Sequence, residues 1–179
     1  MTDMTRYNAA TELLANQVQS QWLNLPNDFN SKYDMVEMVC DFRAAFCNKN
    51  LRRWTVNQKY ENARIARGAF SAGFCGIASY TWNHLFRMPD GGEIWRLKLV
   101  SHKKFNHVWL ENKFTGQPLD LTFDQFIDDG GQYIKIPYDK CGTFTDSNFD
   151  FERAYIFARG LGINLKRIAF INALSHRNR

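Results

Sequence analysis

The chain has 179 residues, which suits a single domain, and its hydrophobic fraction of 45% is enough for an ordinary packed core. No stretch reaches the ~18 uninterrupted apolar residues of a membrane-spanning helix, so no membrane association is expected. The formal net charge is +5, from basic residues without a recognisable RNA-binding motif, which ranks specific nucleic-acid binding low. The first residues lack a secretory signal, which predicts a cytoplasmic location and leaves signal-less export open.

The first fifty residues predict a helical N-terminal extension. Apolar side chains recur at helical spacing over 5–25, where Pro26 ends the run, and again over 33–46. Residues 48–72 are mixed and polar, and predict a loop with a short helix. Cys40 and Cys47 fall on the second helix, where their separation argues against a disulfide and predicts two buried small side chains.

The middle of the chain changes character. Residues 75–86 predict a buried helix, and 93–100 predict a strand after the Pro-Asp-Gly-Gly turn, followed by a polar connection over 101–106. The segments 107–111 and 118–122 flank a turn and predict a hairpin. Later, 123–127 predicts the start of a helix, 133–136 a short strand, 150–161 a helix, and 165–174 a closing segment. The sequence thus predicts one α+β domain spanning 1–179.

The predicted hairpin brings a histidine and a carboxylate together. Side chains alternate across a strand, so placing Val108, Leu110 and the leucines of 118–122 on the core face leaves His107 and Asp120 together on the outer face. They are then direct or diagonal cross-strand neighbours, about 5 to 8 Å apart at Cβ. A carboxylate there can orient the imidazole and stabilise its protonated form.

Cys75 is the candidate nucleophile. It opens the helix predicted after Gly73, and a helix N-terminus lowers the pKa of a thiol through its unpaired N–H groups and partial positive charge. Its own N–H can serve half of an oxyanion hole. Taken alone, a cysteine on an apolar helix face is more often a packing residue; the pairing of His107 with Asp120 raises the odds of a catalytic role.

The other candidates in the chain are weaker. His102 lies in a polar segment, His84 is nine residues along the helix from the predicted nucleophile, and Cys141 has no histidine on a nearby element. A metal site built from His102, His107 and Asp120 stays possible, although no motif supports it. We expect no metal and no cofactor.

The run Gly73-Phe74-Cys75-Gly76-Ile77-Ala78, with His107 and then Leu119-Asp120-Leu121-Thr122-x-x-Gln125-Phe126, resembles the YunG-like family of small bacterial proteins. More distantly it is similar to the transglutaminase-like and NlpC/P60-like branches of papain-fold cysteine enzymes. The resemblance covers Gly73 to Phe126. It implies a papain-like, transglutaminase-like core at 70–140, in which a Cys-bearing helix packs on a small antiparallel sheet, and a catalytic triad of Cys75, His107 and Asp120.

One position departs from the family pattern. The family places a glutamine directly before the cysteine, whereas this chain has Phe74. If that glutamine assists the oxyanion, its contribution must come from elsewhere, and Gln58 or Asn57 are the upstream candidates. Trp109, on the face of His107, is the candidate wall of a substrate groove; its alternative interpretation is a half-exposed aromatic.

Two classes of function follow. The first is a cysteine hydrolase or acyltransferase acting on an amide or ester bond of a peptide, protein or peptidoglycan-like substrate. The second is a catalytically inactive papain-like scaffold that serves as a protein-binding module or inhibitor, of phage or mobile-element type. The reactivity of Cys75 discriminates between them, because a packed thiol has a raised pKa and a catalytic one a lowered pKa. The substrate and the oligomeric state are not encoded in any recognisable motif.

Overall fold

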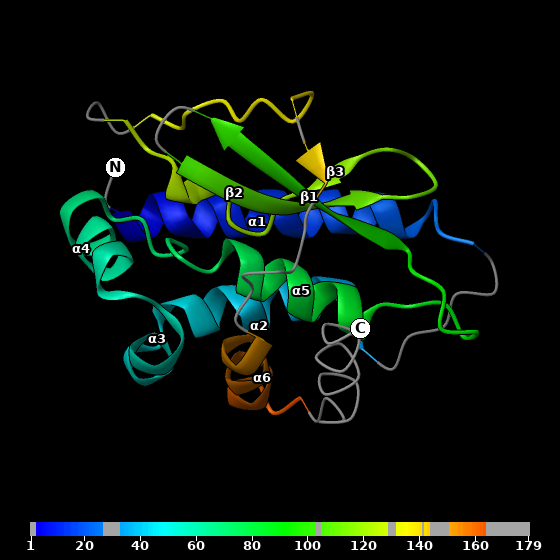
Figure 1. Cartoon of the computed structure of the whole chain (residues 1–179), viewed down its shortest axis with the longest axis horizontal. Coiled ribbons are helices and arrows are strands. Elements are labelled where there is room, and N and C mark those ends of the chain that lie inside the picture. The colour runs from blue at the N-terminus through cyan, green and yellow to red at the C-terminus, as the bar shows by residue number, and fades with distance from the viewer. Residues whose placement is uncertain are drawn as a thin grey trace, which may run out of the picture.

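A computed structural model of the chain describes residues 3–26, 33–102, 105–128, 132–140, 142–143 and 151–163. This part is an α+β fold in which helices pack against a small antiparallel sheet (Figure 1). The elements are, in chain order, α1 (Asp3–Trp22), α2 (Met35–Cys47), α3 (Lys49–Thr55), α4 (Gln58–Arg67), α5 (Cys75–Leu85), β1 (Trp95–His102), β2 (Phe105–Asn112), β3 (Pro118–Leu119), the 3-10 turn η1 (Phe123–Gln125), β4 (Gly142–Thr143) and α6 (Phe151–Gly160).

The N-terminal helices follow the apolar periodicity of the sequence. Helices α1 and α2 lie within two residues of the predicted starts and three of the predicted ends. The segment 48–72 is more helical than predicted, because two asparagines cap new helices. The side chain of Asn48 accepts a hydrogen bond from the Leu51 N–H at the start of α3, and Asn57 accepts one from the Lys59 N–H at the start of α4.

Cys40 and Cys47 are exposed, so the prediction that both are buried is wrong. Helix α2 buries the arc that carries Val39, Phe42 and Phe46. Both cysteines lie outside this buried arc. Their apolar neighbours in the sequence therefore do not predict their burial.

The sheet has the strand order β3-β2-β1-β4, and every neighbouring pair is antiparallel. The predicted connection over 101–106 is wrong: β1 and β2 pair continuously, with Val100 opposite His107 and Ser101 opposite Asn106. Cross-strand pairing overrides the polar composition of this stretch. In the second hairpin Leu110 lies opposite Leu119, which is the register that the apolar alternation predicts.

The later segments follow the predictions only in part. The predicted helix start at 123 is the single turn η1, and the predicted strand at 133–136 is reduced to a bridge between Tyr133 and Ile127. The predicted helix at 150–161 is α6. The predicted closing segment 165–174 and Cys141 lie outside the described residues.

The main core joins the N-terminal helices to the sheet and to α5. In Figure 1 the sheet forms the upper layer, α5 and α2 lie below it, and α6 lies below these. An aromatic cluster fills the space between the helices: the Phe42 ring is 5.2 Å from Phe157 and 5.8 Å from Trp82, and Phe74 stacks on Phe46 at 4.6 Å. Such contacts add to the hydrophobic stabilisation of the core.

Among the described residues, none of the helices combines the length and the apolar character needed to cross a bilayer.

Candidate active site

Cys75 is the first residue of α5, and the backbone before it is tightly fixed. Gly73 has a φ of +86°, and a Cβ built on it would lie 2.7 Å from Val56 Cγ1, so only glycine fits there. Phe74, the N-cap residue, is fully buried and makes no side-chain cap. Phe74 is therefore a core anchor, which fixes the cysteine that follows it.

The start of α5 docks on the free edge of β2, beyond the end of β3. The Val108 backbone N–H faces the Cys75 thiol and lowers its pKa. One helical turn later, the Ser79 hydroxyl lies 3.4 Å from the Val108 carbonyl oxygen. The start of α5 thus lies along Val108, and the half-buried thiol lies beside the residue that precedes it, which is His107.

His107 lies between the thiol and a carboxylate. Its ring is fully buried, and Nε2 is 2.5 Å from Asp120 Oδ2. The Cys75 thiol lies close enough to His107 for each group to shift the pKa of the other. Because Nε2 is engaged by Asp120, the nitrogen left for the thiol is Nδ1. The register of the hairpin makes His107 and Asp120 diagonal neighbours, one of the two arrangements expected from the alternation.

Asp120 is held from three directions. Its Oδ1 accepts hydrogen bonds from the Thr122 N–H at 3.0 Å and the Thr122 hydroxyl at 3.3 Å, and its Oδ2 accepts one from the Tyr138 hydroxyl at 2.9 Å. The carboxylate is 4% exposed, so these donors replace the water that it loses on burial. Tyr138 is itself positioned by an edge-to-face contact with Trp109, with ring centroids 4.9 Å apart.

The electrostatics favour a thiolate–imidazolium pair. Burial alone raises the pKa of a thiol, but the hydrogen bond and positive charge of His107 and the Val108 N–H outweigh it, and the pKa of Cys75 lies below its ordinary value. Burial lowers the pKa of an imidazole, yet Asp120 and the thiolate raise the pKa of His107 to about 10. Each member of the pair stabilises the charged form of the other.

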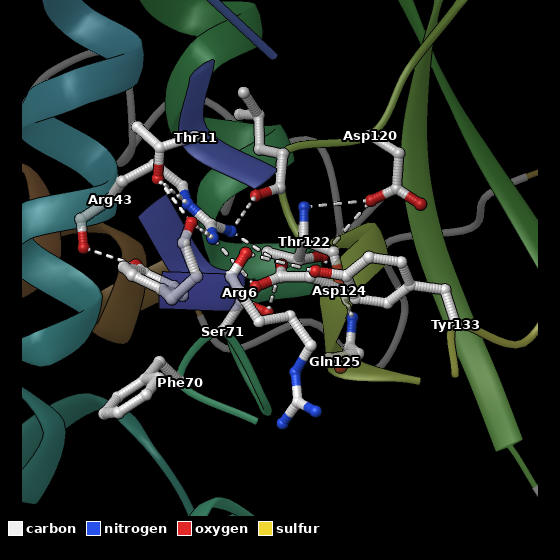
Figure 2. A network of polar contacts seen from close by, with 12 residues as sticks. Arg6, Thr11, Arg43, Phe70, Ser71, Asp120, Thr122, Asp124, Gln125 and Tyr133 are labelled. Carbon is white, nitrogen blue, oxygen red and sulfur yellow. Dashed lines mark hydrogen bonds and ion pairs between the residues drawn. The ribbon is translucent and has the colours of Figure 1, made fainter. Parts of the chain in front are cut away.

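A buried ion pair fastens the segment that follows Asp120. Figure 2 shows Asp124 between the guanidinium of Arg43 from α2 and the hydroxyl of Ser71. The two Arg43–Asp124 bonds are 2.6 and 2.8 Å long, and the Ser71 hydroxyl donates to Asp124 Oδ1 at 2.7 Å. The Arg43 guanidinium stacks 3.8 Å over the Tyr7 ring of α1. One carboxylate thus ties the loop before Cys75 to the segment after Asp120.

The two predicted substrate-binding residues lie elsewhere. Trp109 is 1% exposed, because Tyr138 and the segment around it cover the face expected to be open, so the indole does not line a groove. Gln58 is exposed in the first turn of α4 and bonds Asn62 at 3.3 Å. Asn57 serves as the N-cap of α4. No contact of either amide with the three triad residues is observed among the described side chains.

Other chemistry has little support in the described part of the chain. No group of three or more His, Cys, Asp or Glu side chains has an arrangement suited to a metal ion there, and the His102 side chain lies outside the described part. His84 packs against Tyr80, with ring centroids 4.2 Å apart, away from the triad. A pocket of about 170 Å³ between α1 and Tyr138 reaches Asp120, the far side of the imidazole from the thiol.

Sequence reasoning missed several residues of this site. Gln125 contacts His107, Tyr138 contacts Asp120, and Arg43 and Ser71 meet at Asp124. The signal for Gln125 was present, because it belongs to the run that carries the family resemblance. Tyr138, Arg43 and Ser71 are distant from their partners in the sequence, and only the tertiary fold brings them into contact.

Comparisons of the chain with protein-family models, with curated proteins and with solved structures found no match.

Proposed function

We propose that the protein is a cysteine hydrolase or acyltransferase with a papain-like core, acting on an amide or ester bond. The observation that carries the proposal is the position of His107, fully buried between the Cys75 thiol and the Asp120 carboxylate. The thiol also lies at the start of a helix, which favours its ionised form. Nucleophile, base and orienting group are therefore in hydrogen-bond contact in the order that acyl transfer requires.

In the first half of the reaction the Cys75 thiolate attacks the carbonyl carbon. The electron pair of the carbonyl moves to its oxygen, and the uncapped N–H of Cys75 at the start of α5 stabilises that oxyanion. The tetrahedral species collapses, the bond to the amine or alcohol breaks, and His107 Nδ1–H protonates the leaving group. A thioester on Cys75 and a neutral imidazole remain.

In the second half His107 acts as a base. Nδ1 takes a proton from water, or from an amine in the transferase case, as this acceptor attacks the thioester carbon. Collapse of the second tetrahedral species releases the acid or the new amide, and restores the thiolate and the imidazolium. Asp120 stabilises the imidazolium throughout and does not itself take the proton.

The direct test is formation and turnover of an acyl-enzyme on Cys75. A panel of p-nitrophenyl esters is offered to the wild type, and the acylated peptide is identified by mass spectrometry. We expect a burst of nitrophenol, an acyl group on Cys75, and steady turnover. Cys75→Ser and His107→Ala should abolish both the burst and the turnover, while His84→Ala, which changes a histidine on the same helix away from the triad, should retain them.

Absence of acylation at Cys75 in a folded wild-type protein, across esters and activated amides, would defeat the enzyme proposal. An inert thiol in that experiment would favour the inactive scaffold that acts as a protein-binding module.

A further inference from the structure

Gln125 touches the imidazole on the side that faces the thiol. It is the last residue of η1 and is half-buried. Its Nε2 lies 3.2 Å from His107 Nδ1, 3.1 Å from the Thr122 carbonyl oxygen and 3.0 Å from the Thr122 hydroxyl. The reaction described above gives this amide no role.

The contacts of Gln125 fix which histidine nitrogen carries the proton. A backbone carbonyl can only accept, so the amide nitrogen, and not the amide oxygen, must face Thr122. That nitrogen has two N–H groups and three acceptors within reach, and when His107 is neutral one N–H can donate to the lone pair of Nδ1. The single proton of the neutral ring is therefore on Nε2, where it is donated to Asp120 at 2.5 Å. One short segment of chain sets the state of both ring nitrogens.

The Gln125 N–H favours a different protonation state of His107 from the one that the other groups around the ring favour. Asp120, after β3, and the Cys75 thiolate, from α5, favour the imidazolium, and Tyr138 reaches the ring only through its bond to Asp120. Gln125 donates to a lone pair that exists only in the neutral imidazole, so it favours the neutral pair of thiol and imidazole. Transfer of the thiol proton to Nδ1 removes that acceptor and frees one N–H of Gln125.

We propose that Gln125 is a positioning residue that donates a hydrogen bond to the Nδ1 lone pair of neutral His107 and thereby limits formation of the thiolate–imidazolium pair. The inference rests on the Cys75–His107 pair of the proposed function. The inference predicts a shift opposite to that of a structural role. Loss of the Gln125 amide strengthens the thiolate–imidazolium pair, whereas simple loosening of the site weakens that pair.

The test uses Gln125→Met, which keeps the length of the side chain and removes its donor, with Gln125→Ala as a second variant. The pH profile of Cys75 alkylation by iodoacetamide is measured beside the imidazole titration of His107 by NMR. Loss of one hydrogen bond to the neutral form should move the alkylation midpoint down by roughly half to one pH unit, and the His107 titration up by a similar amount. Gln132→Ala, which removes an exposed glutamine from a nearby loop, should move neither.

Shifts in the opposite direction, with the alkylation midpoint rising and the His107 titration falling, would assign Gln125 a merely structural role and overturn the inference. Unchanged titrations in folded variants would overturn it as well. If Cys75 proves unreactive in the wild type, the proposed function fails, and the His107 titration alone still decides the role of Gln125.

A second inference concerns the charge of the chain. Residues 49–67, which form α3 and α4, hold six of the 23 basic residues and one of the 18 acidic residues, so the remaining 17 of each sign balance. The whole net charge of +5 therefore equals the net charge of this segment. Arg52 and Arg64 both pair with Glu61, at 2.6 Å in each case; the Arg52 pair joins α3 to α4, and the Arg64 pair lies within α4.

Several exposed residues of α3 and α4 lie outside these ion pairs, and we call them together the α3–α4 face. It consists of Lys49, Arg53, Trp54, Lys59 and Tyr60. Trp54 is 66% exposed, with the Arg53 guanidinium 5.8 Å from the centre of its ring, and the Lys59 Nζ lies 4.7 Å from the centre of the Tyr60 ring. Cations beside open aromatic rings form a surface that can bind an anionic chain and its apolar parts together.

This face borders the approach to the nucleophile. Figure 1 shows α3 and α4 at one end of the molecule, with the chain passing from α4 directly into α5. A Cβ at Gly73 would lie 2.9 Å from Tyr60 Cβ, so Tyr60 packs against the backbone two residues before Cys75. A ligand on the α3–α4 face is therefore held next to the loop that presents the thiol.

We infer that the α3–α4 face docks an acidic polypeptide, which supplies the acyl group of the proposed reaction. The positive charge selects an anionic partner, and the proposed acyl transfer selects a partner with amide bonds in its chain, which a polypeptide has and the sugar–phosphate chain of a nucleic acid does not. This inference also rests on the proposed function, but docking itself needs no catalysis.

Docking is measured in a Cys75→Ser background, by the fluorescence anisotropy of a labelled polyglutamate peptide, with a neutral glutamine–serine peptide and a single-stranded DNA of similar charge beside it. Polyglutamate should bind best and weaken with salt. The double change Arg53→Gln and Lys59→Gln should weaken binding by roughly fivefold or more. Lys113→Gln with Lys135→Gln alters net charge equally at exposed positions outside the face and should have a much smaller effect.

If the two double variants lose equal affinity for polyglutamate, only the net charge of the protein matters, and the docking face is overturned. Tighter binding of the DNA would reassign the face to nucleic acid, and no binding of polyglutamate would remove it. If polyglutamate binds while Cys75 proves inert in the acylation test, the docking face stands and the proposed chemistry alone fails.

Discussion

Replacement of His107 by alanine should convert Cys75 from a reactive into an inert thiol. The pKa of Cys75 is set by opposing influences: burial raises it, and the hydrogen bond and charge of His107 lower it. Without the imidazole, burial and the Asp120 carboxylate both raise the pKa, and only the Val108 N–H lowers it. The pKa of Cys75 should therefore move from below to above its ordinary value.

The size of the effect depends on how it is measured. A thiol with the ordinary pKa of about 8.5 is roughly 3% ionised at pH 7, whereas a thiol with a pKa well below 7 is almost fully ionised, a difference of about thirtyfold in thiolate. A less basic thiolate is also a weaker nucleophile, with a slope of about 0.4–0.5, so the rate at pH 7 changes by much less than the thiolate fraction does. The pH of half-maximal rate is therefore the decisive quantity.

The assay is alkylation by iodoacetamide across a pH series, with each cysteine followed separately by peptide mass spectrometry. Separation is needed because Cys40 and Cys47 are exposed and react as well. The expected midpoint for Cys75 lies well below that of the exposed thiols in the wild type, and above it in His107→Ala. The matched control His84→Ala removes a second histidine that packs on Tyr80, and should keep the wild-type profile.

A wild-type midpoint at or above that of Cys40 would refute the reasoning, because the thiol would then be a packed group in spite of its contact with His107. A low midpoint that survives in a folded His107→Ala protein would refute the assignment of the cause, and would leave the helix start and the Val108 N–H as the source of the low pKa.

Two further changes test the surroundings of the pair. Asp120→Asn removes the charge that raises the pKa of His107, so the imidazole titration should fall from about 10 towards its ordinary range, which NMR would reveal; an unchanged His107 titration would contradict it. Asp124→Asn leaves the buried Arg43 without its anionic partner, and should lower the free energy of unfolding in urea by about 3–5 kcal/mol, whereas a loss below about 1 kcal/mol would contradict a fully buried pair.

The parts of the site that the sequence predicts are those fixed by local geometry. The alternation of leucines sets the register of the hairpin, and that register brings His107 and Asp120 onto one face. The start of α5 at Cys75 follows from the small flexible residues before it and the apolar face after it. Neither inference needs knowledge of what packs around the element.

The parts that the sequence does not predict depend on what covers each element. Trp109 was expected on an open face, but Tyr138, 29 residues later, returns over it and also bonds Asp120. Arg43 meets Asp124 across 81 residues of chain, with no pattern that marks either as a partner. A single sequence records which faces are apolar, and it does not record which distant segment closes over a polar one.

The Arg43–Asp124 pair is better explained by placement of the site than by stability. Two buried charges lose most of their hydration, and a well-packed apolar pair of similar volume is commonly as stable or more so. An apolar pair, however, has no directional bonds. Arg43 also bonds the Leu121 carbonyl, and Asp124 accepts from Ser71, so the pair fixes the segment after Asp120 and the loop before Cys75 against the same helix. A thiol, an imidazole and a carboxylate within hydrogen-bond contact need that relative position held to a fraction of an ångström, which directional bonds provide and close packing alone does not.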